Sequence, residues 1–124
     1  MELSFECDNN ADASFLAQEL ESALLRDGIP SQAISLKQRS NENMDIGSVL
    51  SLSLEAATQI LGPVGAIASF AKCIYEIATK HHETVVIVTS DERVRLPPSK
   101  IKLKRVESVV AHSARPKAKS VSKG

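Results

Sequence analysis

Aromatic side chains are scarce in this chain of 124 residues, which has no Trp, one Tyr and three Phe. Base-stacking platforms and sugar-binding surfaces depend on aromatic rings, so the sequence offers little material for either. A hydrophobic core must therefore be built from Leu, Ile, Val and Ala. Long apolar stretches of these residues occur mainly within residues 47–80.

Sequence motifs of catalysis are also missing. The five glycines form neither a phosphate loop nor a dinucleotide fingerprint, and no nucleophile elbow occurs. Ser, Asp and His are present, but none falls in a motif that ties a nucleophile to a base. We therefore expect a protein that is not an enzyme and that needs no cofactor.

The histidines and cysteines give little support for a metal site or a disulfide bond. His81 and His82 are adjacent, so on a helix their side chains point about 100° apart and cannot both bind one ion. Cys7 falls in a strand pattern and Cys73 in a helix pattern, which favours buried, reduced thiols. The N-terminal sequence lacks the basic start and apolar run of a signal peptide, so we expect a cytoplasmic protein.

Charge is divided unevenly along the chain, although the formal net charge is zero. Residues 1–92 contain 5 Lys and Arg against 14 Asp and Glu, whereas residues 93–124 contain 10 against 1. This polarity suits head-to-tail self-association, an acidic partner or nucleic acid, and it is equally compatible with a solvated tail.

The chain opens with a strand, helix, strand pattern. Residues 2–7 alternate between apolar and polar, and residues 32–38 indicate a second short strand. Between them, residues 10–26 have helical spacing, with Phe15, Leu16, Leu20 and Leu24 on one side. A unit of this size is normally a right-handed crossover between parallel strands.

The central segment, residues 47–80, divides at Gly62-Pro63 into two apolar helical arms, 48–61 and 64–80. Gly62 suits the end of one helix and Pro63 the first turn of the next, which predicts a tight helical hairpin. At about 1.5 Å rise per residue, each arm is shorter than the ~30 Å hydrocarbon core of a membrane. Burial in a soluble core is therefore favoured, and insertion as an oligomer is the alternative.

Residues 84–89 and 93–96 predict a valine-rich strand and its partner, and residues 104–113 predict a final helix. The expected fold is one α+β domain over residues 1–114, in the order β-α-β-αα-β-β-α. Its small mixed four-stranded sheet would pack against the central apolar helical hairpin and helix 11–26. Residues 115–124 are expected to be a disordered basic tail.

Four segments give the chain a family resemblance. They are the alternating residues 2–7, the sequence Asn43-Met44-Asp45-Ile46-Gly47, the break Gly62-Pro63-Val64-Gly65, and the strands and turn of residues 84–96. In these features the chain resembles the effector-associated constant component family of bacterial conflict systems. The resemblance implies a non-catalytic protein of bacterial immunity and antiviral defence, which helps to recruit, hold or assemble variable effector or sensor proteins.

Three functional hypotheses follow. The first is an adaptor that self-associates or binds an effector or sensor protein of the same operon, for which we expect a homo-oligomer. The second is a small membrane-active effector whose helical pair inserts as an oligomer, and the weakest is nucleic-acid binding through residues 93–124. The candidate interaction residues are apolar positions of the central segment and cations of the basic end: Leu50, Leu54, Ile60, Val64, Ile67, Phe70, Ile74, Arg93, Arg95 and Lys102.

Overall fold

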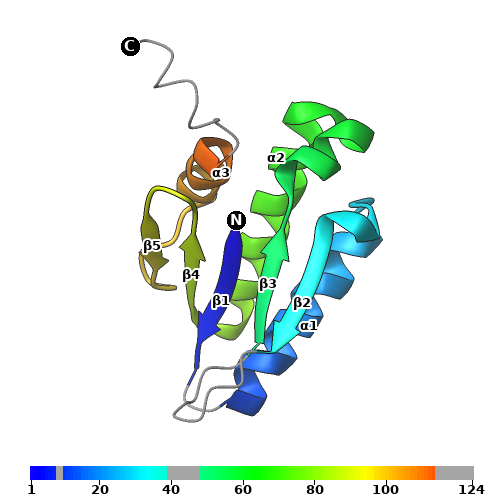
Figure 1. The fold of residues 1–124 in the computed structure, drawn as a ribbon. Coiled ribbons are helices and arrows are strands. Elements are labelled where there is room, and N and C mark those ends of the chain that lie inside the picture. The colour runs from blue at the N-terminus through cyan, green and yellow to red at the C-terminus, as the bar shows by residue number, and fades with distance from the viewer. Residues whose placement is uncertain (8–9, 39–47, 114–124) are drawn as a thin grey trace.

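Five antiparallel strands form one sheet in the order β2-β3-β1-β4-β5 (Figure 1). The computed structural model describes residues 1–7, 10–38 and 48–113. The strands are β1 (Glu2–Glu6), β2 (Ile34–Gln38), β3 (Ser48–Leu52), β4 (Thr84–Val88) and β5 (Arg93–Leu96). The helices are α1 (Asn10–Arg26), α2 (Leu54–His81) and α3 (Leu103–Ser113), and a 3-10 turn, η1 (Ser31–Ala33), precedes β2.

The α+β class is confirmed, whereas the mixed four-stranded sheet is wrong in strand number and pairing. Strand β2 runs in the same direction as β1, because each pairs antiparallel with β3. However, β3 lies between them, so the two strands of the predicted crossover are not neighbours. The predicted basic tail at 115–124, and the segment 43–47 that contributes to the family resemblance, lie outside the described residues.

Strand β1 occupies the centre of the sheet. Its alternation directs Leu3 and Phe5 into the core, where they are 1% and 4% exposed. Leu3 lies opposite Leu50 of β3 on one side and Ile87 of β4 on the other. The half-buried strand predicted from residues 2–7 is therefore confirmed, and it joins segments that are distant in sequence.

The first part of the predicted central helix is strand β3 instead. Helix α2 begins at Leu54, after Ser53 accepts a hydrogen bond through its Oγ from the backbone N–H of Ala56 at 3.1 Å. This is an N-terminal cap, which fixes where a helix starts. Because Leu50 and Leu52 face the core beneath the helices, the stretch 48–52 satisfies a strand period as well as a helical one.

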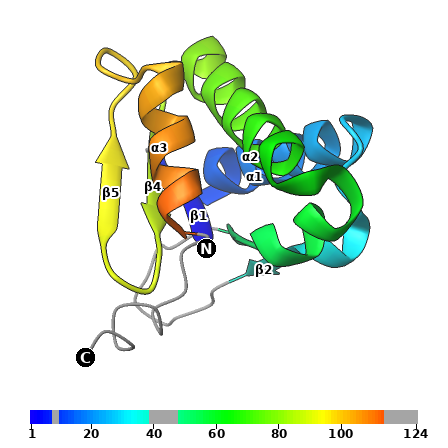
Figure 2. The ribbon, with the colours of Figure 1, turned by 90° about the horizontal axis from the view of Figure 1, so that it is seen from above.

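The predicted break at Gly62 is confirmed. Gly62 has φ 79° and ψ 163°, a conformation that residues with a side chain rarely adopt. The two arms of α2, before and after this glycine, run in different directions (Figure 2). The first arm continues from β3 beyond the end of the sheet, and the second returns along the sheet (Figure 1).

All three helices lie on the same face of the sheet (Figures 1 and 2). Their buried side chains form one core with the inward side chains of the strands. Fully buried members from the three helices include Leu20, Leu24, Phe70, Ile74, Val106 and Val110. Helices α1 and α3 match the predicted helices 11–26 and 104–113 within one residue, but Phe15 of α1 is 60% exposed rather than part of the core.

Two polar clusters fasten α1 to α2. At the end of α1, the Oγ of Ser69 donates to Asp27 Oδ2 at 2.6 Å, and Lys72 Nζ lies 3.2 Å from Asp27 Oδ1. The hydrogen bond from Ser69 lowers the pKa of Asp27, and Lys72 lowers it further against the opposing effect of burial. Toward the start of α1, Glu19 contacts Lys80 at 3.2 Å and His81 at 3.0 Å. These contacts hold the second arm of α2 in place.

Candidate interaction surface

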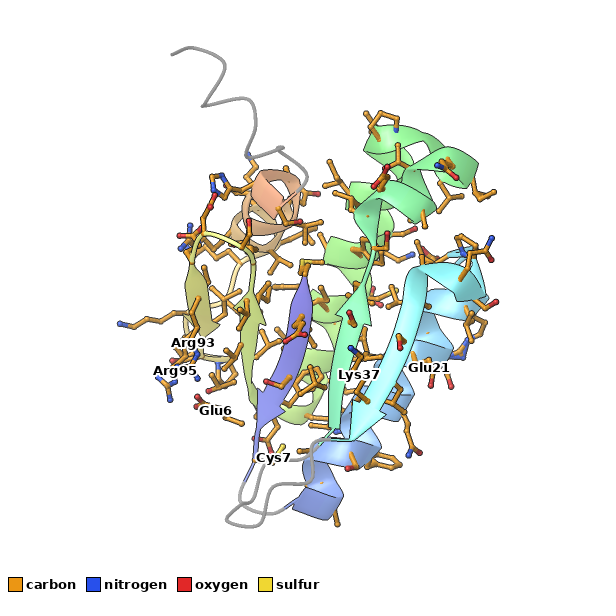
Figure 3. The ribbon with its side chains drawn as sticks, in the orientation of Figure 1. Glu6, Cys7, Glu21, Lys37, Arg93 and Arg95 are labelled. Atoms are coloured by element: carbon orange, nitrogen blue, oxygen red, sulfur yellow. The ribbon has the colours of Figure 1, made fainter. Side chains whose placement is uncertain are left out.

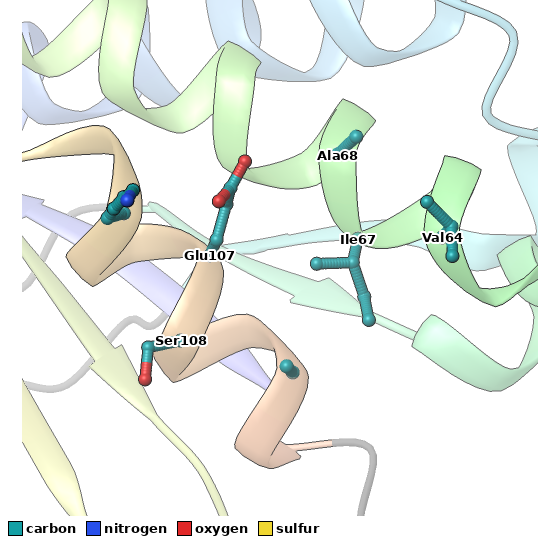
Figure 4. A pocket seen from close by; sticks show the side chains of 7 residues that line it. Val64, Ile67, Ala68, Glu107 and Ser108 are labelled. Carbon is teal, nitrogen blue, oxygen red and sulfur yellow. The ribbon is translucent and has the colours of Figure 1, made fainter.

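A groove of about 470 Å³ lies between α2 and α3 (Figure 4). We call it the α2–α3 groove. One wall is the second arm of α2, and the other is the adjacent face of α3. Its lining residues are Val64, Ile67 and Ala68 from α2, with Lys104, Glu107, Ser108 and Ala111 from α3.

The spacing of residues on α3 explains the groove. Val106, Val109 and Val110 point into the core, since they are 0–2% exposed. The positions that line the groove, 104, 107, 108 and 111, recur at i, i+3, i+4 and i+7 and so form the neighbouring face of the helix. Because Ser108, Ala111 and the facing Ala68 are small, the space between the helices remains open.

Two exposed apolar side chains lie on either side of the break in α2, and the second of them lines the groove. We call Ile60 and Val64 the kink knob; they are 62% and 80% exposed. The neighbouring Leu61 packs beside Gly28, where an added Cβ would lie 3.8 Å from Leu61 Cδ2. Since successive helical residues point about 100° apart, Leu61 turns inward while Ile60 turns to solvent. Val64 belongs to the kink knob and also lines the groove, so the knob and the groove share this residue.

Charges at the groove come from α3. Lys104 is exposed and Glu107 is half-buried, and both line the groove from positions one turn apart. Lys100, Lys102 and Arg105 are also exposed around the start of this helix. The predicted interaction residue Lys102 is two residues before Lys104 in the sequence, but it does not itself line the groove.

Four predicted interaction residues are core residues instead. Leu50, Leu54, Phe70 and Ile74 are 0%, 7%, 0% and 0% exposed. Leu50 belongs to β3 and faces the helices, and the other three lie on the inner face of α2. A partner cannot reach them, so their assignment to an interaction surface is wrong. Val64 and Ile67 both line the groove, so the structure brings these two predicted residues together, whereas Ile60 is exposed without lining it.

The predicted arginines lie on another surface. Val94 and Leu96 of β5 face the core, so the alternating Arg93 and Arg95 project from the face of the sheet opposite the helices (Figure 3). Arg95 forms an ion pair with Glu6, with Nη2 and Oε1 2.9 Å apart. The hydrogen bond from Arg95 lowers the pKa of Glu6, although partial burial opposes this change. Neither arginine contributes to the α2–α3 groove.

Within residues 1–7, 10–38 and 48–113, no group of three His, Cys, Asp or Glu could hold a metal ion. Cys73 is buried and Cys7 is half-buried. Burial raises the pKa of Cys73 to about 11, so this thiol is protonated at neutral pH and is a poor nucleophile.

By length and composition, helix α2 is long and apolar enough to cross a membrane. The mean hydropathy of its most apolar 18 residues is 1.4. It is the one such helix among the described residues. One third of this 18-residue stretch is buried inside the fold, and Gly62 interrupts the helix. The helix also contributes buried side chains, among them Phe70 and Ile74, to the hydrophobic core.

The α3 wall of the groove was not among the predicted interaction residues, although its i, i+3, i+4, i+7 spacing is visible in the sequence beside the buried valines. No family model, no curated protein and no solved structure matches this chain. The kink knob and the α2–α3 groove thus stand as the candidate site on their geometry alone.

Proposed function

We propose that this chain is a non-catalytic interaction module, which assembles with a protein partner through the kink knob and the α2–α3 groove. The observation that supports this function is the 80% exposure of Val64 directly beside an apolar groove of about 470 Å³. Exposed apolar surface is costly in water, and a continuous patch of it commonly marks a protein interaction site.

The family resemblance supports a role in bacterial defence. In that role the partner is an effector or sensor protein of the same operon, which the module recruits or with which it forms an oligomer. The segment Gly62-Pro63-Val64-Gly65 contributes to the resemblance, and it also builds the kink knob. A break that displays apolar residues suits an adaptor, because it provides contact area at no cost to the core.

Co-expression with the products of neighbouring genes tests the proposal. We expect an affinity-tagged chain to retain one of these proteins, and Val64→Lys to abolish the retention because it places a charge in the interface. Val88→Lys is the matched control, since Val88 is 37% exposed on the opposite face of the sheet. Retention that survives Val64→Lys, or that is lost equally in Val88→Lys, excludes this surface.

A second candidate function is membrane insertion by α2. The favouring observation is that the most apolar long helix of the described residues also displays Ile60 and Val64 to solvent. Insertion would require Phe70 and Ile74 to leave the core. Dye release from vesicles of phosphatidylcholine and phosphatidylglycerol measures it directly: release that Val64→Lys abolishes supports insertion, and intact vesicles at all protein concentrations exclude it.

A further inference from the structure

We infer that the α2–α3 groove receives the kink knob of a second copy of this chain, in a two-fold symmetric dimer. This inference rests on the proposed function and names the partner at that site. It follows from the relative positions of the knob and the groove, and from the order of charges on α3.

The surface is complementary to itself. In a two-fold dimer the same patch of both copies forms the interface, so each projection must have a matching recess within that patch. Ile60 and Val64 are exposed, and Val64 borders the recess that Ile67, Ala68 and Ala111 also line. Rotation about an axis between knob and groove would therefore seat each knob in the other copy's groove and cover both apolar surfaces at once.

The groove has the small residues that such seating needs. Ala68 lines the groove from α2 and Ala111 lines it from α3, and Ser108 adds a third short side chain. Branched aliphatic side chains fit well between helices where the facing residues are small, because ridges then enter grooves without overlap. The exposed Val64 and Ile60 are side chains of this kind.

Charges on α3 fit the same symmetry. Lys104 and Glu107 line the groove one helical turn apart and have opposite signs. When a two-fold axis is perpendicular to α3, the two copies of the helix run antiparallel. Lys104 of each copy would then face Glu107 of the other. Such an arrangement gives two complementary pairs per dimer and fixes the register of the interface.

Charge reversal provides a specific test. In Lys104→Glu, both lining charges are negative, and in Glu107→Lys both are positive, so each single variant should repel itself and dimerise about tenfold more weakly or worse. The double variant, Lys104→Glu with Glu107→Lys, restores two opposite pairs and should dimerise like the wild type. Light scattering over a range of protein concentrations measures the mass, and circular dichroism verifies that each variant is folded.

Mixing the two single variants gives the most informative result. One copy then contributes two negative charges and the other two positive charges, so both pairs across the axis are complementary again. We expect a heterodimer to form from the two weakly dimerising variants, detected by co-purification when one of them has an affinity tag. A heterologous site for another protein would not show this rescue.

The outcomes separate this inference from the proposed function. If the wild type dimerises, Val64→Lys makes it monomeric and the mixture restores dimers, the inference holds. A dimer that is indifferent to these substitutions overturns it, as does a single variant that dimerises like the wild type. If the wild type stays monomeric while an operon-encoded protein is retained through Val64, the dimer is excluded and the proposed function stands. Absence of both kinds of complex overturns both.

Discussion

Replacing Gly62 by alanine isolates the backbone strain at the break in α2. The residue has φ 79° and ψ 163°, a region of backbone space that essentially only glycine occupies. A Cβ added at Gly62 would meet no atom within 4 Å, so the substitution creates no steric clash with other parts of the protein. Any loss of stability therefore reports the backbone conformation itself.

The expected loss is set by two opposing effects. A side chain held in this region costs about 1–3 kcal/mol in the folded state. Alanine also restricts the unfolded chain, which offsets about 0.4–1 kcal/mol of that cost. The net free energy of unfolding should fall by about 1–2 kcal/mol in Gly62→Ala. For a small domain this corresponds to a decrease of about 0.5–1 M in the urea concentration at the midpoint of unfolding.

Gly65→Ala is the matched control. Gly65 lies in the second arm without a positive φ, and an added Cβ would lie 3.4 Å from Leu61 Cβ, which is an ordinary contact. Alanine is the better helix former by about 0.5–1 kcal/mol, so this variant should be as stable as the wild type or more stable. Urea unfolding followed by circular dichroism compares the three proteins. A Gly62→Ala protein as stable as Gly65→Ala would refute the assigned strain.

Two further predictions concern polar and thiol groups. Asp27→Asn removes a carboxylate whose pKa is lowered in the folded state, so its stabilising effect is present above the unfolded pKa and disappears as the pH falls through the folded one. The stability difference between wild type and Asp27→Asn should therefore be largest near pH 7 and shrink below about pH 4; a difference that grows in acid contradicts the contact with Lys72. For the thiols, a maleimide at pH 7 should modify the half-buried Cys7 first, whereas Cys73, with its pKa raised to about 11, should react only on unfolding. A Cys7→Ser variant that still reacts rapidly would show that Cys73 is accessible.

Much of the fold is encoded in local patterns. The alternation of Leu3 and Phe5 predicts the central strand, and the spacing of the buried valines in α3 predicts that helix within one residue. Gly62 followed by Pro63 locates the break in α2, because few other residues tolerate that backbone conformation. These features depend on neighbours in sequence, so no knowledge of the tertiary structure is needed.

The remaining features depend on contacts between distant residues. The run of residues 48–52 satisfies both a helical and a strand period, and only pairing with β1 and β2 makes it a strand. Likewise, an apolar helix does not indicate which of its sides a neighbour will cover. Phe70 and Val64 are both apolar residues of α2, yet Phe70 is 0% exposed and Val64 is 80% exposed. The difference arises because the core lies on only one side of the helix. The interaction surface could not be separated from the core for this reason.

The central place of β1 has a consequence for biosynthesis. Its two neighbours in the sheet are β3 and β4, and Glu2 pairs with Val88 in the finished protein. At about 5–20 residues per second, a ribosome needs roughly 4–17 s after making Glu2 to reach Val88. During that interval one edge of β1 has no partner. An open strand edge can pair with other nascent chains. The β4–β5 hairpin must therefore be made before β1 is covered on both sides.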